Sequence, residues 1–339
     1  MSETLDEHTQ PDTSDTMDAS TSRLEQQLTR EEQPRKRRQL RVAPRWQVLT
    51  LLLVFVAGLG GGFLLRDRIP VTKSERAAAA AVALAKQVNP PEGFTLPAVY
   101  GDIGPQLLQA GAIDDSKFVR VYQASGRPLS EEQLAILRQK GQGPIVINQQ
   151  NAYFMLNFFW ALGLVNKNPI LEKGQMMASG KQQVGNFAST GGWTIGARTA
   201  TELYASAEIV KLTPEQQARL EEVANNVYRP CCGNPTSFPD CNHGMALLGL
   251  LELMASQGAS VDQMFTAAKQ VNAFWFPDQT FELATYFKAV EGKDFRAVDA
   301  RRMVGQDFMS GSGFQQVHRT LAARGLLPQA PGKSQSCGV

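Results

Sequence analysis

The chain has 339 residues, of which 43% are hydrophobic and only 19% are charged, so complete disorder is excluded. Its 34 basic and 32 acidic residues leave a formal net charge of +2. This balance creates no strong positive field, and we therefore expect no nucleic-acid partner. Three histidines leave little for a metal site built mainly from imidazoles.

Residues 1–45 are predicted to form a disordered cytoplasmic tail that ends in a basic juxtamembrane run. The first 34 residues are rich in Ser, Thr, Asp, Glu and Gln, and they cannot bury enough apolar surface to offset the loss of chain entropy. Six Lys and Arg residues then follow within residues 35–45. A run of this kind next to a membrane attracts anionic lipid headgroups.

Residues 46–65 contain no charged side chain and are predicted to form a single transmembrane helix. At a rise of about 1.5 Å per residue, such a helix crosses a hydrocarbon layer of about 30 Å. A cleavable signal peptide is the alternative, but it has a short charged region and a small-residue cleavage site. The 45 residues before this segment therefore favour an uncleaved signal anchor in the lipid bilayer.

The charges on the two sides of this segment predict its orientation. Six Lys and Arg residues precede it, whereas Arg66, Arg68 and Lys73 follow it, so the positive-inside rule places the amino terminus in the cytoplasm and the C-terminal domain outside it. Gly58 and Gly62 are four residues apart and would allow two helices to approach closely as a homodimer. The alternative is the ordinary glycine content of a membrane helix.

The remainder of the chain is predicted to be mainly α-helical. Residues 66–92 are an Ala-rich stalk or linker, residues 93–328 are an all-α extracytoplasmic domain with at most a minor hairpin, and residues 329–339 are a flexible C-terminus. The two best strand candidates are short, at Val119 to Tyr122 and at Ile145 to Ile147.

Three helix starts carry a capping signal. Ser130, Thr213 and Ser260 each precede a stretch whose apolar residues recur at intervals of three and four. Thr213 is also followed by Pro214, which suits the first position of a helix.

Two segments are apolar nearly all round, Tyr153 to Leu164 and Met245 to Ala255, which is typical of buried helices that are too short to cross a membrane. Asn157 and Glu252 interrupt them, and we expect these residues at polar edges that face water or a partner. Phe274 to Pro277 is predicted to be a buried helix end.

The densest group of reactive side chains is a Cys-Cys-x₈-Cys-x-His segment, in which thirteen residues contain Cys231, Cys232, Cys241 and His243. Gly and Pro residues make the intervening stretch a loop. Asp240 is predicted to be the N-cap of the following helix, so that Cys241 and His243 would lie in its first turn. The helix dipole there favours the deprotonated forms of both side chains, which are the forms that bind metals.

These four residues match the Cys₃His ligand set of zinc, and the sulfur-rich set also suits copper(I) or an iron–sulfur cluster. Zinc sites usually contain cysteines spaced C-x₂₋₄-C, however, and adjacent cysteines in an extended chain point to opposite sides. Both Cys231 and Cys232 can therefore bind one metal only if a turn reorients one of them.

Two other interpretations of the same segment stay open. A structural disulfide between Cys241 and one of the paired cysteines would make the domain a non-enzymatic envelope interaction module. A cysteine activated beside His243 would instead make it a thiol-redox enzyme. The sequence contains no H-E-x-x-H, C-x-x-C-H or Walker pattern, so no enzyme class is assigned.

Overall fold

The computed structural model describes residues 72–327. The predicted tail 1–45, the predicted span 46–65 with its Gly58/Gly62 face, and the predicted C-terminus 329–339 lie outside the described residues. Within residues 72–327, no helix combines the length and the apolar character needed to cross a bilayer.

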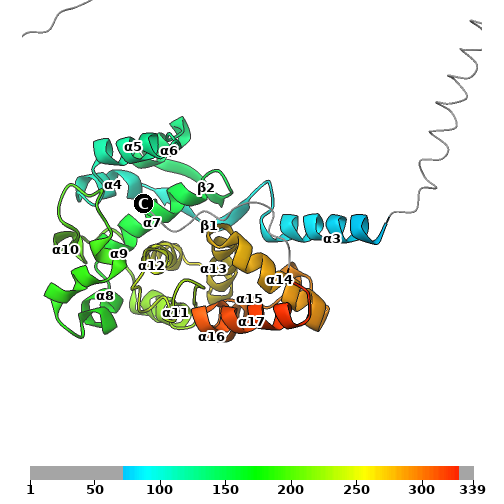
Figure 1. The fold of residues 1–339 in the computed structure, drawn as a ribbon. Coiled ribbons are helices and arrows are strands. Elements are labelled where there is room, and N and C mark those ends of the chain that lie inside the picture. The colour runs from blue at the N-terminus through cyan, green and yellow to red at the C-terminus, as the bar shows by residue number, and fades with distance from the viewer. Residues whose placement is uncertain (1–71, 328–339) are drawn as a thin grey trace, which may run out of the picture. The chain divides into compact units, whose positions relative to one another are not determined.

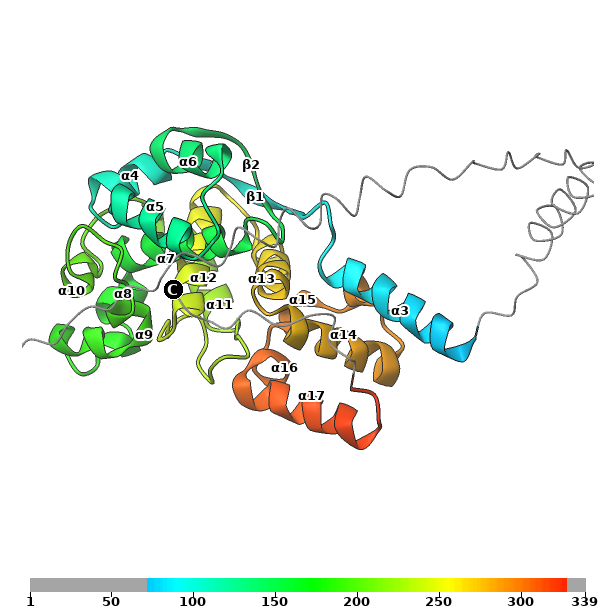
Figure 2. The same ribbon diagram turned by 45° about the horizontal axis from the view of Figure 1, so that its top comes forward.

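The described residues are mainly helical and contain one two-stranded antiparallel sheet (Figures 1 and 2). In chain order the elements are α3 (Lys73–Val88), β1 (Phe94–Gly101), α4 (Ile103–Gln109), α5 (Asp115–Ala124), α6 (Glu131–Arg138), β2 (Gly141–Ile147), α7 (Ala152–Val165), α8 (Pro169–Lys173), η2 (Gln175–Met177), η3 (Lys181–Asn186), α9 (Ala188–Gly191), α10 (Ala200–Leu203), α11 (Pro214–Ala224), α12 (Asn242–Ser256), α13 (Val261–Trp275), α14 (Pro277–Glu291), η4 (Phe295–Ala297), α15 (Ala300–Met303), α16 (Gln306–Met309) and α17 (Gly311–Ala323).

Two apolar helices, α7 and α12, pack against each other at the centre of the core (Figure 1). They correspond to the two segments predicted to be buried, and nearly every residue of both is buried. Gly163 on α7 and Gly249 on α12 lie at their closest approach, where a Cβ on Gly249 would be 2.5 Å from the carbonyl oxygen of Phe159. The absence of side chains at these two positions lets the helix backbones meet.

Gly163→Ala should lower the free energy of unfolding by about 1–3 kcal/mol, the usual cost of overpacking a core. The added methyl group would overlap the carbonyl oxygen of Met245, so the two helices would have to move apart. Gly143→Ala is the control, because a Cβ there meets nothing within 4 Å. Urea unfolding followed by tryptophan fluorescence measures both, and equal losses would contradict this packing.

The two polar residues that interrupt these helices were expected to face water or a partner, but they do not. Asn157 and Glu252 are both fully buried, because α7 and α12 are covered on all sides and have no polar edge. The Asn157 side-chain amide donates to the Tyr122 hydroxyl oxygen at 2.9 Å. Burial raises the pKa of Glu252 well above its ordinary value of 4.5, although Asn166 and Asn168 act in the opposite direction. The fold therefore favours the protonated, neutral form of Glu252.

Glu252→Gln should gain stability relative to the parent as the pH rises. Above pH 4.5 the unfolded chain releases the Glu252 proton while the folded chain keeps it. The parent's free energy of unfolding therefore falls by up to about 1.4 kcal/mol per pH unit until the folded pKa is reached. Glutamine has no such proton. Urea unfolding of both proteins between about pH 4 and pH 8 measures the gap, and a gap that does not change with pH would contradict the buried neutral carboxyl.

The predicted hairpin is half correct. Ile145 to Ile147 lies in β2, as expected, but Val119 to Tyr122 lies in helix α5. This segment forms a helix because Asp114 caps it by accepting from the backbone N–H of Lys117 at 2.9 Å. In addition, Phe118 and Tyr122 are four residues apart and share one buried face of the helix. The partner of β2 is β1, which the sequence did not suggest because it contains Pro97.

The three predicted helix starts are confirmed. Ser130, Thr213 and Ser260 are the N-caps of α6, α11 and α13, and each forms a capping box with a glutamine three residues later. The predicted buried helix end at Phe274 to Pro277 is correct in part. Phe274 and Phe276 are buried where α13 ends and α14 begins, whereas Trp275 is partly buried and Pro277 is exposed.

The Ala-rich segment forms helix α3, which projects from the rest of the domain (Figures 1 and 2). Its amino-terminal turns are exposed, but at its carboxyl end Val88 is buried in a second apolar cluster with Phe281 and Phe287 of α14. This end of the helix is therefore fixed to the domain.

Candidate metal centre

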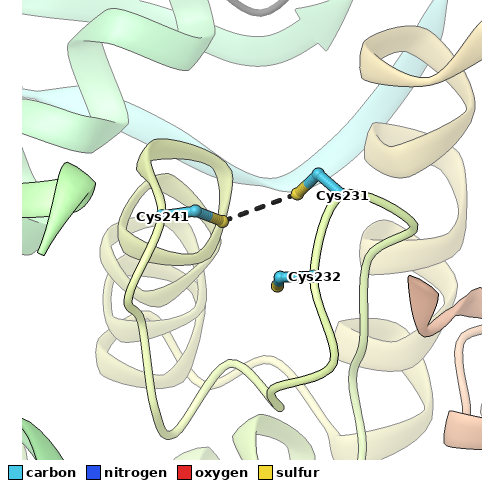
Figure 3. Close-up of side chains that lie close together, drawn as sticks. All are labelled: Cys231, Cys232 and Cys241. Atoms are coloured by element: carbon cyan, nitrogen blue, oxygen red, sulfur yellow. Dashed lines mark hydrogen bonds between the residues drawn. The ribbon is translucent and has the colours of Figure 1, made fainter. Parts of the chain in front are cut away.

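The predicted cysteine segment forms a loop between α11 and α12 (Figure 3). Several backbone hydrogen bonds fix the loop to the helices around it. Ser237 donates through its N–H to the carbonyl oxygen of Ala224, the last residue of α11, at 3.0 Å, and Gly311, at the start of α17, donates to the carbonyl oxygen of Cys232 at 2.7 Å. Cys231 and Cys232 are thus held on a loop of defined shape.

Cys241 itself is the N-cap of α12, and the prediction that Asp240 occupies this position is wrong. The Cys241 sulfur accepts from the backbone N–H of Gly244 at 3.4 Å, which is the role that a Ser or Asp side chain usually has at a helix start. The Asp240 carboxylate instead accepts from Asn234 and Arg229, each at 2.8 Å. These stronger charge-assisted partners explain why it does not cap the helix.

Arg229 connects the parts of this loop. Its side chain is completely buried and donates to the Cys241 sulfur (3.2 Å), to the carbonyl oxygens of Asn234 (2.9 Å) and Phe238 (3.3 Å), and to the Asp240 carboxylate (2.8 Å). This residue was not predicted from the sequence, because arginines are usually exposed. Its two-residue distance from Cys231 was the only signal available.

Gly244, in the first turn of α12, makes room for this arginine. A Cβ at position 244 would lie 2.5 Å from Cζ of Arg229. The guanidinium group therefore packs against the helix backbone where a side chain would otherwise be.

The structure brings the three predicted cysteine ligands together. Their sulfur atoms all lie within 4.8 Å of one another, and those of Cys231 and Cys241 point toward each other at 3.6 Å (Figure 3). All three are free thiols. The turn required to reorient one of the adjacent cysteines is present, so this group of sulfurs can hold a metal ion.

The three thiols differ in their affinity for protons. Hydrogen bonds from Cys231 and then Cys232, together with the Arg229 charge, hold the pKa of Cys241 well below its ordinary value. Hydrogen bonding to Cys232 and Cys241, together with burial, raises the pKa of Cys231. The group thus favours one thiolate, at Cys241. Converting the other two thiols to thiolates at such short distances needs a compensating cation.

His243, the fourth predicted ligand, lies in the first turn of α12 and is almost fully buried. Its ring packs against the rings of Phe276 (centroids 4.4 Å apart) and Trp275 (5.8 Å). Burial lowers the pKa of His243 to about 4, so its imidazole is neutral at pH 7. Within residues 72–327, the ligand atoms that gather within 4.8 Å are the three sulfurs, without a His243 nitrogen.

Comparisons of this chain with protein-family models, with curated proteins and with solved structures give no significant match. The site is therefore interpreted from its own geometry and chemistry.

Proposed function

We propose that this protein is a membrane-anchored, extracytoplasmic metal-binding protein whose ligands are the thiolates of Cys231, Cys232 and Cys241. The observation that carries the proposal is the convergence of the three sulfur atoms within 4.8 Å. Two of them come from one turn of a loop and the third from a helix start. Thiolates so arranged are the ligands that zinc, copper(I) and iron–sulfur clusters use.

Zinc is the metal that this site favours. Three thiolates and the Asp240 carboxylate would face a single buried guanidinium, that of Arg229. A dication leaves less uncompensated negative charge at this site than a monocation such as copper(I) does. Iron–sulfur clusters usually need four cysteine ligands, one more than the described loop supplies.

Three cysteines leave one position of a tetrahedral zinc ion. His243 remains the proposed fourth ligand, because it follows Cys241 by only two residues and its imidazole is neutral at pH 7. Binding through His243 would require its ring to leave Phe276. If the ring stays in place, water or a partner ligand fills the position.

A competition titration of zinc against a chromophoric chelator tests the proposal on the full-length chain, purified in a mild detergent under reducing conditions. We expect one zinc per chain. Three substitutions, Cys231→Ser, Cys232→Ser and Cys241→Ser, should each weaken the affinity for zinc by more than the roughly 10–100-fold that is typical of changes around a metal site's ligands. Cys337→Ser should leave the affinity unchanged. Unchanged affinity in all three variants would contradict the proposal. His243→Ala tests the fourth ligand in the same titration.

The membrane anchor is proposed from residues 46–65, which carry no charge, and from the six Lys and Arg residues in 35–45 that precede them. Protease added to intact cells, with any outer membrane first permeabilised, tests this topology. We expect the domain after Arg66 to be degraded while a tag at the amino terminus survives. Survival of the domain with loss of the tag would show the opposite topology.

A further inference from the structure

The three cysteines differ in how solvent reaches them. Cys231 is exposed, whereas Cys232 and Cys241 are partly buried. Cys231 is therefore the most accessible of the three residues to an external molecule. A thiol must be accessible as well as ionised to react with a disulfide. A bound metal ion holds the Cys231 sulfur as the thiolate, and in the metal-free loop the Cys241 sulfur, at 3.6 Å, can take the Cys231 proton.

Cys231 and Cys241 are also the pair best placed to join. Their sulfurs face each other at 3.6 Å (Figure 3), so a closure of about 1.5 Å would bring them to the disulfide bond length of about 2.05 Å. Arg229 and the backbone N–H of Gly244 hold the Cys241 sulfur in this position.

Cys232 is held differently. Gly311 donates to its carbonyl oxygen at 2.7 Å, which attaches its backbone to the start of α17. Its own thiol donates to the carbonyl oxygen of Asn234 at 3.9 Å. The Cys232 sulfur also lies within 4.8 Å of the other two, but the 3.6 Å contact joins Cys231 and Cys241.

We propose that external disulfides act on this site as substrates and open it by thiol–disulfide exchange, with Cys231 as the attacking thiol and Cys241 as the resolving thiol. The release of metal in this scheme rests on the proposed metal-binding function. The pairing of the two cysteines does not, because it concerns the metal-free loop as well.

In the first step the Cys231 thiolate attacks one sulfur of the external disulfide. A bond forms between the two sulfurs, the external disulfide bond breaks, and one external thiolate leaves. In the second step the Cys241 thiolate attacks the Cys231 sulfur of this mixed disulfide and releases the second external thiolate. The protein loses two electrons and the external disulfide gains them. In the metal-bound protein both cysteines are already thiolates, so the two released thiolates take their protons from water; in the metal-free protein, any proton on the two cysteines passes to the released thiolates. Only Cys232 remains as a cysteine ligand, and the metal leaves.

Titration of the zinc-loaded full-length chain with oxidised glutathione tests the proposal. Zinc release is followed with a chromophoric indicator, and disulfides are mapped by mass spectrometry of peptides after the free thiols are blocked. We expect a Cys231–Cys241 disulfide, one zinc released for each disulfide formed, and recovery of binding after reduction. A disulfide that includes Cys232 as the main product, or zinc that stays bound after the Cys231–Cys241 disulfide forms, would overturn the proposal.

Variants separate the two steps. Cys241→Ser should accumulate a glutathione adduct on Cys231, because the resolving thiol is missing, and Cys232→Ser should still form the Cys231–Cys241 disulfide. An adduct mainly on Cys232 in the Cys241→Ser protein would contradict the assigned order. The same mapping on metal-free protein tests the pairing of Cys231 with Cys241 independently of metal binding. If zinc never binds, the proposed function fails, but the expected disulfide still appears.

Discussion

Arg229→Met should lower the free energy of unfolding of the metal-free protein by about 3–5 kcal/mol, the usual cost of removing one partner of a buried ion pair. The change removes the donor to the Cys241 sulfur, to two carbonyl oxygens and to the Asp240 carboxylate. Asp240 keeps 23% of its side chain exposed, so water partly solvates the charge that is left. The loss should therefore lie near the lower end of this range.

Arg138→Met is the matched control for this substitution. Arg138 also contacts an aspartate, Asp115, through two nitrogens (3.0 and 3.1 Å), but the two side chains are 46% and 42% exposed. An exposed pair contributes about 0–1 kcal/mol. Urea unfolding in the presence of a chelator compares the two variants, and equal small losses would show that Arg229 does not hold the loop together.

Cys241→Ser should abolish the stabilisation that zinc gives to the domain. Serine is a good helix N-cap, so this substitution keeps the capping role of residue 241 and removes its sulfur. In the parent, free zinc at 1,000 times its dissociation constant should add about 4 kcal/mol to the free energy of unfolding. In the variant, the same zinc concentration should add little.

Thermal and urea unfolding with zinc and with a chelator measure this difference. Cys337→Ser is the control, because residue 337 belongs to the segment 329–339 that we predict to be a flexible C-terminus. Equal zinc stabilisation of the parent and the Cys241→Ser protein would contradict a role for this sulfur. A loss of stability that persists in chelator would instead show that the serine does not replace the cap.

The sequence predicted much of this structure where the signals were local. Capping residues at positions 130, 213 and 260 and the two apolar helices follow from patterns within a few residues of the chain. The strand expected at Val119 to Tyr122 was wrong because its β-branched residues favour a strand only weakly, and the Asp114 cap and the buried face of α5 favour the helix. Strand β1 depends on pairing with β2, about 45 residues away, and no local pattern reveals such pairing.

The candidate site was also predicted only where the signals were local. The concentration of cysteines and the Gly and Pro residues between them identified the loop, and the three sulfurs do come together. Arg229 was not predicted, because its importance comes from burial and from four acceptors that only the folded loop brings within reach. The same contacts changed the role of Asp240, which pairs with Arg229 and leaves the helix cap to Cys241.

X-ray absorption spectroscopy at the zinc edge of the loaded, reduced full-length chain tests the central claim most directly. The three-thiolate site predicts three sulfur scatterers at about 2.3 Å and one nitrogen or oxygen scatterer at about 2.0–2.1 Å. In His243→Ala the sulfur shell should stay unchanged, and only the single lighter scatterer should change. A first shell composed of nitrogen and oxygen, with one sulfur or none, would contradict a metal centre built from Cys231, Cys232 and Cys241.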